Sequence, residues 1–162
     1  MLSDPMDEIE AKIALQLLRD ARQPVSEIAK KIGVTRQTVA KKLVALEESG
    51  MVRGFVARLD RGRLGLGTMA YVFLNEETGA RIREEIERVI KGWPEVYAFH
   101  RLFGRYSAVL GVLVRNDAEL KRLIKRIHRL RGIRGTETFI VHSTVKDDPE
   151  APLAEAIARE FR

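Results

Sequence analysis

The amino-terminal part of the fold is decided by the stretch SEIAKKIGVTRQTVAKKL, residues 26–43. Apolar residues recur at helical spacing on both sides of a central glycine: Ile28, Ile32, Val39 and Leu43. Gly33 supplies a turn, Thr35 can cap the helix that follows, and the small Ala29 lets two helices cross closely. The stretch therefore predicts a helix-turn-helix.

The outward side of the second of these helices carries polar residues that suit the major groove of DNA. They are Thr35, Arg36, Gln37, Thr38 and Lys41. Arginine can bind O6 and N7 of guanine together, glutamine can bind N6 and N7 of adenine, and recognition helices touch base edges near their amino end. Further basic residues are expected to contact phosphates, which gives affinity and register: Lys30, Lys31, Lys42, Arg53 and Arg58. The alternative is that all these residues form the solvated face of an ordinary three-helix bundle.

The flanks of this stretch complete an amino-terminal domain over residues 1–59. Ile9, Ile13 and Leu17 predict an amphipathic first helix within residues 6–18. Residues 51–59 alternate and are rich in branched and aromatic side chains, which predicts a strand or short hairpin and hence a winged helix-turn-helix. Residues 60–67 contain three glycines and are the best linker candidate in the chain.

The second half, residues 68–145, shows one pattern used twice. Strands are expected at 68–74, 96–103, 106–114 and 133–142, and helices at 77–91 and 117–130. Two successive β-α-β units with antiparallel pairing predict a ferredoxin-like βαββαβ domain, so that the whole chain is of the α+β class. Residues 146–162 are expected to be a tail with a short helix at 152–161, docked on its own domain or on a neighbouring subunit.

Composition narrows the classes of function. The chain has 162 residues and a formal charge of +6, which suits a polyanionic partner, and its 32% of charged residues is typical of an ion-pair-rich thermophilic surface. It has no cysteine, which excludes disulfides and thiolate chemistry. No apolar run approaches the ~20 residues of a membrane span, and the amino terminus lacks a signal core, so we expect a cytoplasmic protein without membrane contact.

Histidines are too sparse to predict a metal site. His128 is expected to be solvated, whereas His100 and His142 fall in predicted strands and could meet across the sheet. No third ligand has a matching spacing, so we expect no metal. We also expect no cofactor and no catalytic residue.

The order and spacing of several short motifs resemble the Lrp/AsnC family of transcriptional regulators over about residues 6–145. The motifs lie at 6–13, 21–22, 27–29, 33–35, 46–55, 104–106 and 135–138. The resemblance implies a regulator that binds double-stranded DNA. It also implies that the carboxy-terminal domain dimerises through its sheet, and that the homodimers assemble further into tetramers or octamers.

The resemblance further implies a small-molecule effector, usually an amino acid, that binds between the carboxy-terminal domains of the oligomer. The matching positions are Gly104, Tyr106, Ser107, Thr136 and Thr138. Many members carry an aspartate where this chain has Ser107, and a neutral hydroxyl cannot supply the charge that pairs with an ammonium group. The sequence leaves open a different effector, or none.

Two other functions are alternatives to a sequence-specific regulator. Some proteins that resemble this family decarboxylate siroheme. Such a role needs a tetrapyrrole pocket with histidine or arginine, and histidines are few in this chain. A sequence-indifferent DNA-wrapping or ligand-sensing protein is the second alternative. A basic helix face could provide a path for wrapped DNA, or it could simply be solvated. Its residues are Lys121, Arg122, Lys125, Arg126 and Arg129.

Overall fold

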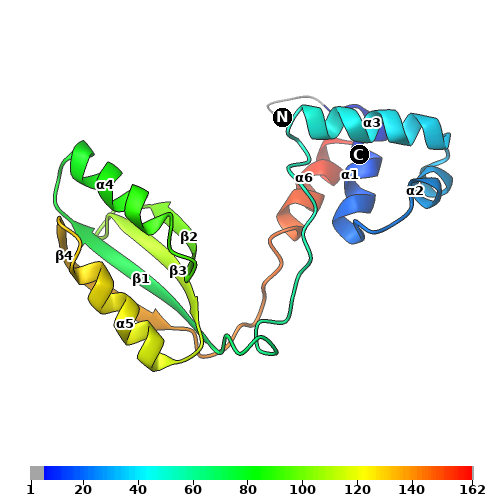
Figure 1. The fold of residues 1–162 in the computed structure, drawn as a ribbon. Coiled ribbons are helices and arrows are strands. Elements are labelled where there is room, and N and C mark those ends of the chain that lie inside the picture. The colour runs from blue at the N-terminus through cyan, green and yellow to red at the C-terminus, as the bar shows by residue number, and fades with distance from the viewer. Residues whose placement is uncertain (1–5, 162) are drawn as a thin grey trace. The chain divides into compact units, whose positions relative to one another are not determined.

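Helices build the first of the two units into which the chain divides. The computed structural model describes residues 6–161 (Figure 1). The first unit runs to Arg58 and also takes in the chain from Lys146 onward, and the second unit is Leu59–Val145. The helices of the first unit are α1 (Glu8–Arg19), α2 (Val25–Ile32), α3 (Arg36–Glu48) and α6 (Ala151–Glu160).

The core of the first unit contains Ile28 and Val39 of the apolar seam predicted from residues 26–43 and has Ile32 packed against it, whereas Leu43 is only half-buried and is not part of this core. Ile13, Ile28 and Val39 are fully buried in it. Burying an aliphatic side chain of this size stabilises a fold by about 1.5–3 kcal/mol. Gly33 ends α2 with φ of 76°, a left-handed conformation that glycine adopts without steric cost, and so supplies the predicted turn into α3.

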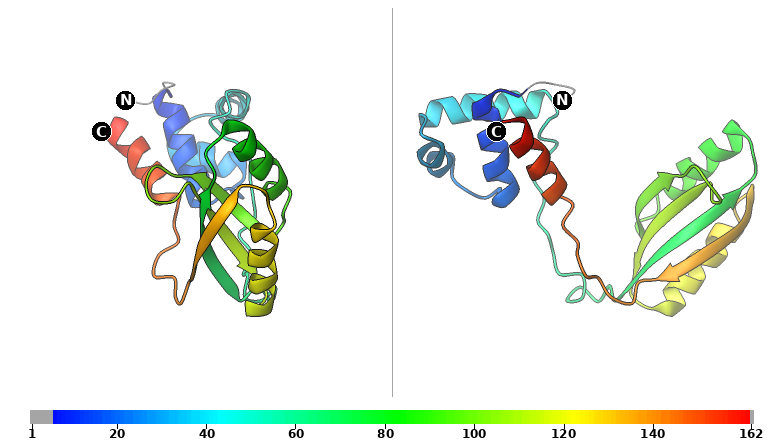
Figure 2. Two further views of the ribbon diagram at one scale, coloured as in Figure 1. Left: turned by 90° about the vertical axis from the view of Figure 1, so that its left-hand side faces the viewer. Right: turned by 180° about the vertical axis from the view of Figure 1, so that it is seen from behind.

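The carboxy-terminal helix α6 packs against α1, as both views of Figure 2 show. Ile157 is the residue of α6 that enters the core of the first unit, whereas Leu153 and Phe161 stay partly exposed. The tail therefore belongs to the amino-terminal unit of its own chain, and not to the ferredoxin-like domain that precedes it.

The strand expected at residues 51–59 is not formed, and this part of the winged prediction is wrong for the single chain. Phe55, Val56 and Leu59 are exposed there. A strand needs a second strand to pair its backbone N–H and C=O groups, and this segment has none beside it in the described chain. The alternating pattern alone could not reveal the missing partner.

The second unit is an antiparallel sheet with two helices, as the sequence predicts. Its elements are β1 (Thr68–Glu76), α4 (Ala80–Ile90), β2 (Val96–Arg101), β3 (Ala108–Val114), α5 (Asp117–His128) and β4 (Ile133–Ile140). The strand order is β2-β3-β1-β4, with antiparallel pairing throughout. This is the βαββαβ order of a ferredoxin-like domain.

The two faces of this sheet differ in their cover. Helices α4 and α5 cover one face of the sheet (Figure 1). Ile86 and Ile90 of α4 and Leu123 and Ile127 of α5 are buried in one core with residues of β1 and β3. The opposite face carries no helix of this unit and displays aromatic side chains: Tyr71, Phe73, Tyr97 and Phe139. We call this the open face.

Two glycines of this unit lie where side chains pack closely against the backbone. A Cβ on Gly132, which has φ of 88°, would lie 2.2 Å from Cγ2 of Ile82 in α4. A Cβ on Gly111 of β3 would lie 2.6 Å from the ring of Tyr97, which rests over the backbone on the open face.

Candidate nucleic-acid interface

The amino end of α3 is fixed by its cap. The Thr35 hydroxyl accepts a hydrogen bond from the Thr38 backbone N–H at 3.1 Å, and the two hydroxyls lie 2.8 Å apart. The cap satisfies one of the free N–H groups at this end, where the helix dipole is positive and favours an anion. The hydroxyls of Thr35 and Thr38 are thus engaged with each other.

Three of the predicted base-contacting residues are free on the outward side of α3. Arg36, Gln37 and Lys41 are exposed, and in the described part of the chain none of them forms a hydrogen bond or an ion pair. On the other side of the same helix Val39 and Leu46 are buried. The buried side holds the helix in place while long polar side chains extend into solvent, which is the arrangement a recognition helix needs.

The outward side of α3 also carries apolar residues that sequence reasoning missed. Ala40 is exposed between Arg36 and Lys41, and Val44 is 52% exposed one turn further on. Small apolar side chains can contact the methyl group of thymine in the major groove. Counting helical positions from the buried Val39 would have placed Val44 about 140° around the helix from it, and so on the outward side.

The five predicted phosphate contacts divide into free and engaged residues. Lys30 and Arg53 are exposed and have no partner among the described residues. Lys31 donates to the side-chain oxygen of Gln23. Arg58 donates to the Glu150 carboxylate at 3.3 Å and to the Asp147 carbonyl at 3.0 Å, which joins the end of the first segment to the tail.

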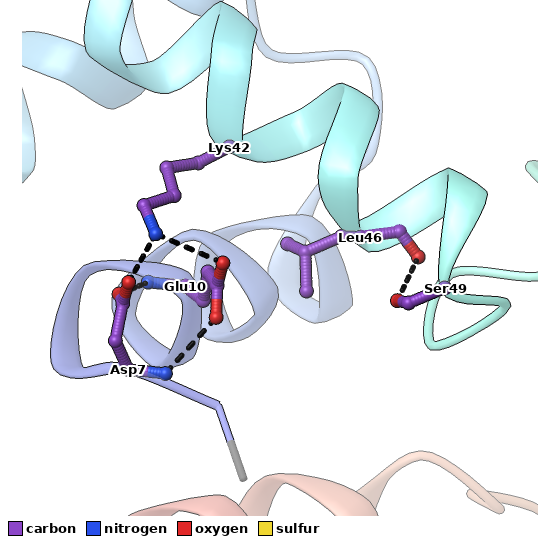
Figure 3. Close-up of polar contacts among 5 residues, drawn as sticks. All are labelled: Asp7, Glu10, Lys42, Leu46 and Ser49. Atoms are coloured by element: carbon purple, nitrogen blue, oxygen red, sulfur yellow. Dashed lines mark hydrogen bonds and ion pairs between the residues drawn. The ribbon is translucent and has the colours of Figure 1, made fainter. Parts of the chain in front are cut away.

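Lys42, the fifth of these residues, belongs to an ion cluster between α3 and α1 (Figure 3). The Asp7 carboxylate accepts from the Glu10 N–H, and the Glu10 carboxylate accepts from the Asp7 N–H, both at 2.9 Å. This is a capping box at the start of α1. Lys42 donates to Asp7 and, at 3.0 Å, to Glu10. Its ammonium is therefore committed within the subunit.

The cluster shifts the pKa values of two of its members. The hydrogen bond from Lys42, followed by that from the Glu10 backbone N–H, lowers the pKa of Asp7 below its ordinary value. The hydrogen bond to Asp7, followed by that to Glu10, raises the pKa of Lys42. Both shifts favour the charged forms, so the ion pair between α1 and α3 is present at neutral pH.

The loop before β3 holds the predicted effector residues Gly104, Tyr106 and Ser107. Gly104 has φ of 144°, and the Tyr106 ring lies 5.0 Å from that of Phe73. Ser107 donates from its hydroxyl and from its N–H to the Leu74 carbonyl, both at 2.9 Å. The hydroxyl proton of Ser107 is therefore used to fasten the loop to β1.

Thr136 and Thr138, the other two predicted effector residues, lie on the opposite side of this strand end. They pair with Leu74 and Val72, whose side chains are buried beneath the helices. Thr136 is also hydrogen-bonded to His128 of α5 at 2.7 Å, so that histidine has a protein partner. The structure thus brings Ser107 and Thr136 to either side of Leu74, with Tyr106 against Phe73.

The histidines do not gather into a metal site. His100 lies on β2 and His142 follows β4, and these strands are at opposite edges of the sheet, so the expectation that the two could meet is wrong. Among the described residues no group of three potential ligands is close enough to hold a metal ion. Nor does any described helix have the length and apolar character to cross a membrane.

Comparison with known proteins covers both units. A model of the AsnC-type helix-turn-helix domain matches residues 6–47, and a model of the Lrp/AsnC ligand-binding domain matches residues 69–151. The HTH-type transcriptional regulator FL11 of Pyrococcus horikoshii is 30% identical over 149 residues, which is 92% of this chain and 97% of that protein. A further HTH-type transcriptional regulator, from Pyrococcus abyssi, is 31% identical over 143 residues, or 88% and 96% of the two chains.

Solved structures show the same fold. The crystal structure of an AsnC family regulator from Agrobacterium tumefaciens aligns with a TM-score of 0.86 at 26% identity, over 93% of this chain and 99% of that one. A regulator from Neisseria meningitidis in complex with L-Met aligns with a TM-score of 0.87 at 20% identity, over 94% and 99%. The chain therefore belongs to the Lrp/AsnC family of helix-turn-helix transcriptional regulators.

Proposed function

We propose that this regulator recognises a specific DNA sequence through Arg36, Gln37 and Lys41 of α3. The observation that carries the proposal is the exposure of these three side chains on a capped helix whose other side is buried. Arg36 and Gln37 are in the first turn, where recognition helices approach base edges, and Ala40 and Val44 add apolar contacts on the same side. Glu47 and Glu48, at the far end of α3, would repel phosphates and so confine the contacts to the first turns.

We also propose that two copies pair through the open face of the sheet. Tyr71, Tyr97 and Phe139 are each between 41% and 51% exposed there, which is unusual for large side chains grouped on one surface. A two-fold dimer would place two recognition helices in successive major grooves about 34–36 Å apart on a pseudo-palindromic site. Assembly of such dimers into tetramers or octamers would add further pairs of recognition helices.

The test of sequence recognition is selection of bound fragments from a random pool of duplex DNA. The double variant Arg36→Ala, Gln37→Ala should lose about 1–3 kcal/mol on the selected site for each base contact removed, and its own selected pool should show a weaker consensus. Arg19→Ala, an exposed arginine on α1, serves as the control that removes a charge elsewhere on the unit. An unchanged consensus for the double variant would contradict the assignment of α3.

The second unit is proposed to bind a small effector near Gly104, Tyr106 and Ser107, with Thr136 across the strand end. The match to a ligand-binding domain supports this role, as does the L-Met bound by the Neisseria meningitidis regulator. Because the Ser107 hydroxyl is neutral and engaged with Leu74, we expect no partner for an ammonium group at that position. Calorimetric titration with L-methionine and with its α-keto acid should then give similar affinities. A strong preference for the amino acid would contradict this expectation.

We propose a regulatory rather than an enzymatic role for the chain in the cytoplasm. The relatives to which it is similar are HTH-type transcriptional regulators, and the proposed DNA recognition needs no catalytic step. The siroheme decarboxylase alternative is tested directly by adding siroheme and recording its absorbance spectrum, which should not change.

A further inference from the structure

The charge of the chain is concentrated on one segment outside the helix-turn-helix. Residues 115–134, which contain α5, carry eight lysines and arginines against two acidic residues, Asp117 and Glu119. This excess of +6 equals the formal charge of the whole chain, so the rest of the protein is neutral on balance. The two acidic residues lie in the first turn of α5, where the helix dipole stabilises negative charge. All other charged residues of the segment are basic.

These cations are on the outward side of α5. Leu120, Leu123 and Ile127 are buried against the sheet. The opposite side presents Lys121, Lys125 and Arg129, which are exposed and form no ion pair or hydrogen bond through their side chains in the described part of the chain. We call these three residues the α5 row.

Neighbouring basic residues show what partnered cations look like in this unit. Arg126 lies 3.8 Å from the centre of the Trp93 ring and is 3.0 Å from the Glu95 carboxylate. Arg122 is 3.8 Å from Glu119 within the same helix. The α5 row has no such partner among the described residues, although helix α4 on the same face of the sheet carries exposed glutamates.

Helix α4, which covers the same face of the sheet, provides the internal comparison. Its exposed side mixes both signs, with four basic residues against three glutamates over residues 80–91. Stabilisation of a helix end by basic residues in its last turn explains Lys125 and Arg129, but it does not explain Lys121 in the middle of α5 or Arg131 and Arg134 beyond it. A polyanion explains all of them.

From this distribution we propose that the outward side of α5 is a second, sequence-indifferent contact surface for the phosphate backbone of duplex DNA. Residues four apart on a helix are about 6 Å apart along its axis, so the α5 row places three cations over about 12 Å. One strand of B-DNA presents about three to four phosphates over that length. The row points away from the sheet, so pairing of two copies through the open face leaves it uncovered.

This second surface does a different task from α3. Contacts to phosphates supply affinity and steep salt dependence without reading the bases. Duplex DNA is the partner favoured here because the helix-turn-helix of the same chain is proposed to bind it, and the inference rests on that proposed function. The α5 surface would then hold flanking DNA against the second unit while α3 occupies its site.

The test compares two triple variants of the full-length protein on a long duplex of random sequence. One variant neutralises the α5 row, Lys121→Gln, Lys125→Gln and Arg129→Gln. The matched control removes the same charge from α4, Arg81→Gln, Arg88→Gln and Lys91→Gln, at positions that are equally exposed. The logarithm of the binding constant is measured against the logarithm of salt concentration, and Trp93 fluorescence on heating shows whether each variant is folded.

For the α5 variant we expect the salt slope to fall by about 2 to 3 per bound subunit, with an affinity at low salt about tenfold lower or more. The α4 control should keep the wild-type slope. If the triple variant is poorly folded, Lys125→Glu, which reverses a single charge, replaces it in the test. This variant should also lower the salt slope. Equal slopes for the α5 and α4 variants would overturn the proposal.

Two further arms separate this proposal from others. Repeating the α5 substitutions in the Arg36→Ala, Gln37→Ala background should leave the loss of slope intact, so that a failure of α3 as the reader appears only in sequence selectivity. A-form duplex RNA is the competing ligand. If neutralising the row weakens binding to RNA and not to DNA, the assignment to duplex DNA is overturned.

Discussion

At the scale of single residues, Lys42 shows how a basic side chain on the second helix of a helix-turn-helix can be paired within the fold. The sequence places it beside Lys41 and predicts a DNA contact for each residue, with a base for Lys41 and with a phosphate for Lys42. The structure pairs Lys42 with Asp7 and Glu10, which lie more than 30 residues earlier in the chain. No local pattern reveals such a pair, whereas the periodic burial of Ile28 and Val39 could be predicted directly from spacing.

The Asp7–Lys42 pair predicts a pH dependence for the first unit. Asp7→Asn keeps a side chain that can cap α1 and removes the ion pair, so it should lower protection of the α1 amides from hydrogen exchange at pH 6. The folded pKa of Asp7 lies below the unfolded value of about 3.9, so the stability it contributes is present above that value. This stability is lost as the pH falls through the folded pKa, and wild type and variant should converge there.

The control for this prediction is Glu8→Gln, which removes an exposed pair with Lys12 in the same helix turn. Exposed pairs of that kind contribute little, so the control should leave α1 protection nearly unchanged at both pH values. A difference between Asp7→Asn and wild type that stays undiminished at the acid end would show that the carboxylate charge is not its cause.

A second prediction at this scale concerns Gly132. Gly132→Ala places a Cβ against Ile82 at a backbone conformation that disfavours it, and should lower the free energy of unfolding of the second unit by about 1–3 kcal/mol. Gly135→Ala is the matched control, since its Cβ would meet nothing within 4 Å. Urea unfolding followed by the fluorescence of Trp93, the only tryptophan of the chain, measures both variants. Equal midpoints would show that α4 adjusts to the added methyl group.

At the scale of elements, the sequence predicts what a short window contains and fails where a distant surface decides. The helices and strands of residues 68–145 follow from their apolar periods, because each buries one side on the same core. The strand at 51–59 was wrong because extended backbone needs a neighbour to pair with. The docking place of α6 could not be read from Leu153, Ile157 and Phe161, since the spacing does not say which surface they meet.

Helix α6 also gives a prediction at this scale. Ile157→Ala should destabilise the first unit by about 2–5 kcal/mol, because it empties a position in the core shared with α1. Leu153→Ala, which truncates a side chain that is 55% exposed, should change stability little. Hydrogen exchange of the α1 and α3 amides reports on this unit alone. If Ile157→Ala left that exchange unchanged, α6 would not be part of the folded core.

At the scale of the whole molecule, the chain combines a helix-turn-helix unit with a sheet of which one face carries no helix of its own unit. Sequence periodicity finds the apolar positions of β1, but it cannot tell a core-facing row from a partner-facing one. Tyr71 and Val72 differ in burial only because the helices cover one side of the sheet. The resemblance to Lrp/AsnC regulators implies pairing of two copies through the sheet. The exposed aromatic residues of the open face are the positions that would form this interface.

Pairing through the open face predicts that Tyr71→Ser, Phe139→Ser weakens self-association. Buried aromatic residues near the centre of an interface often contribute 2 kcal/mol or more each, so the dimer dissociation constant should rise by roughly tenfold or more. Val145→Ser, at a fully exposed position outside the sheet, is the control. Sedimentation velocity over a range of concentrations measures the change. Because two linked recognition helices bind a pseudo-palindromic site more tightly than one, the same variant should also lose affinity for the selected DNA while keeping its consensus for a half-site.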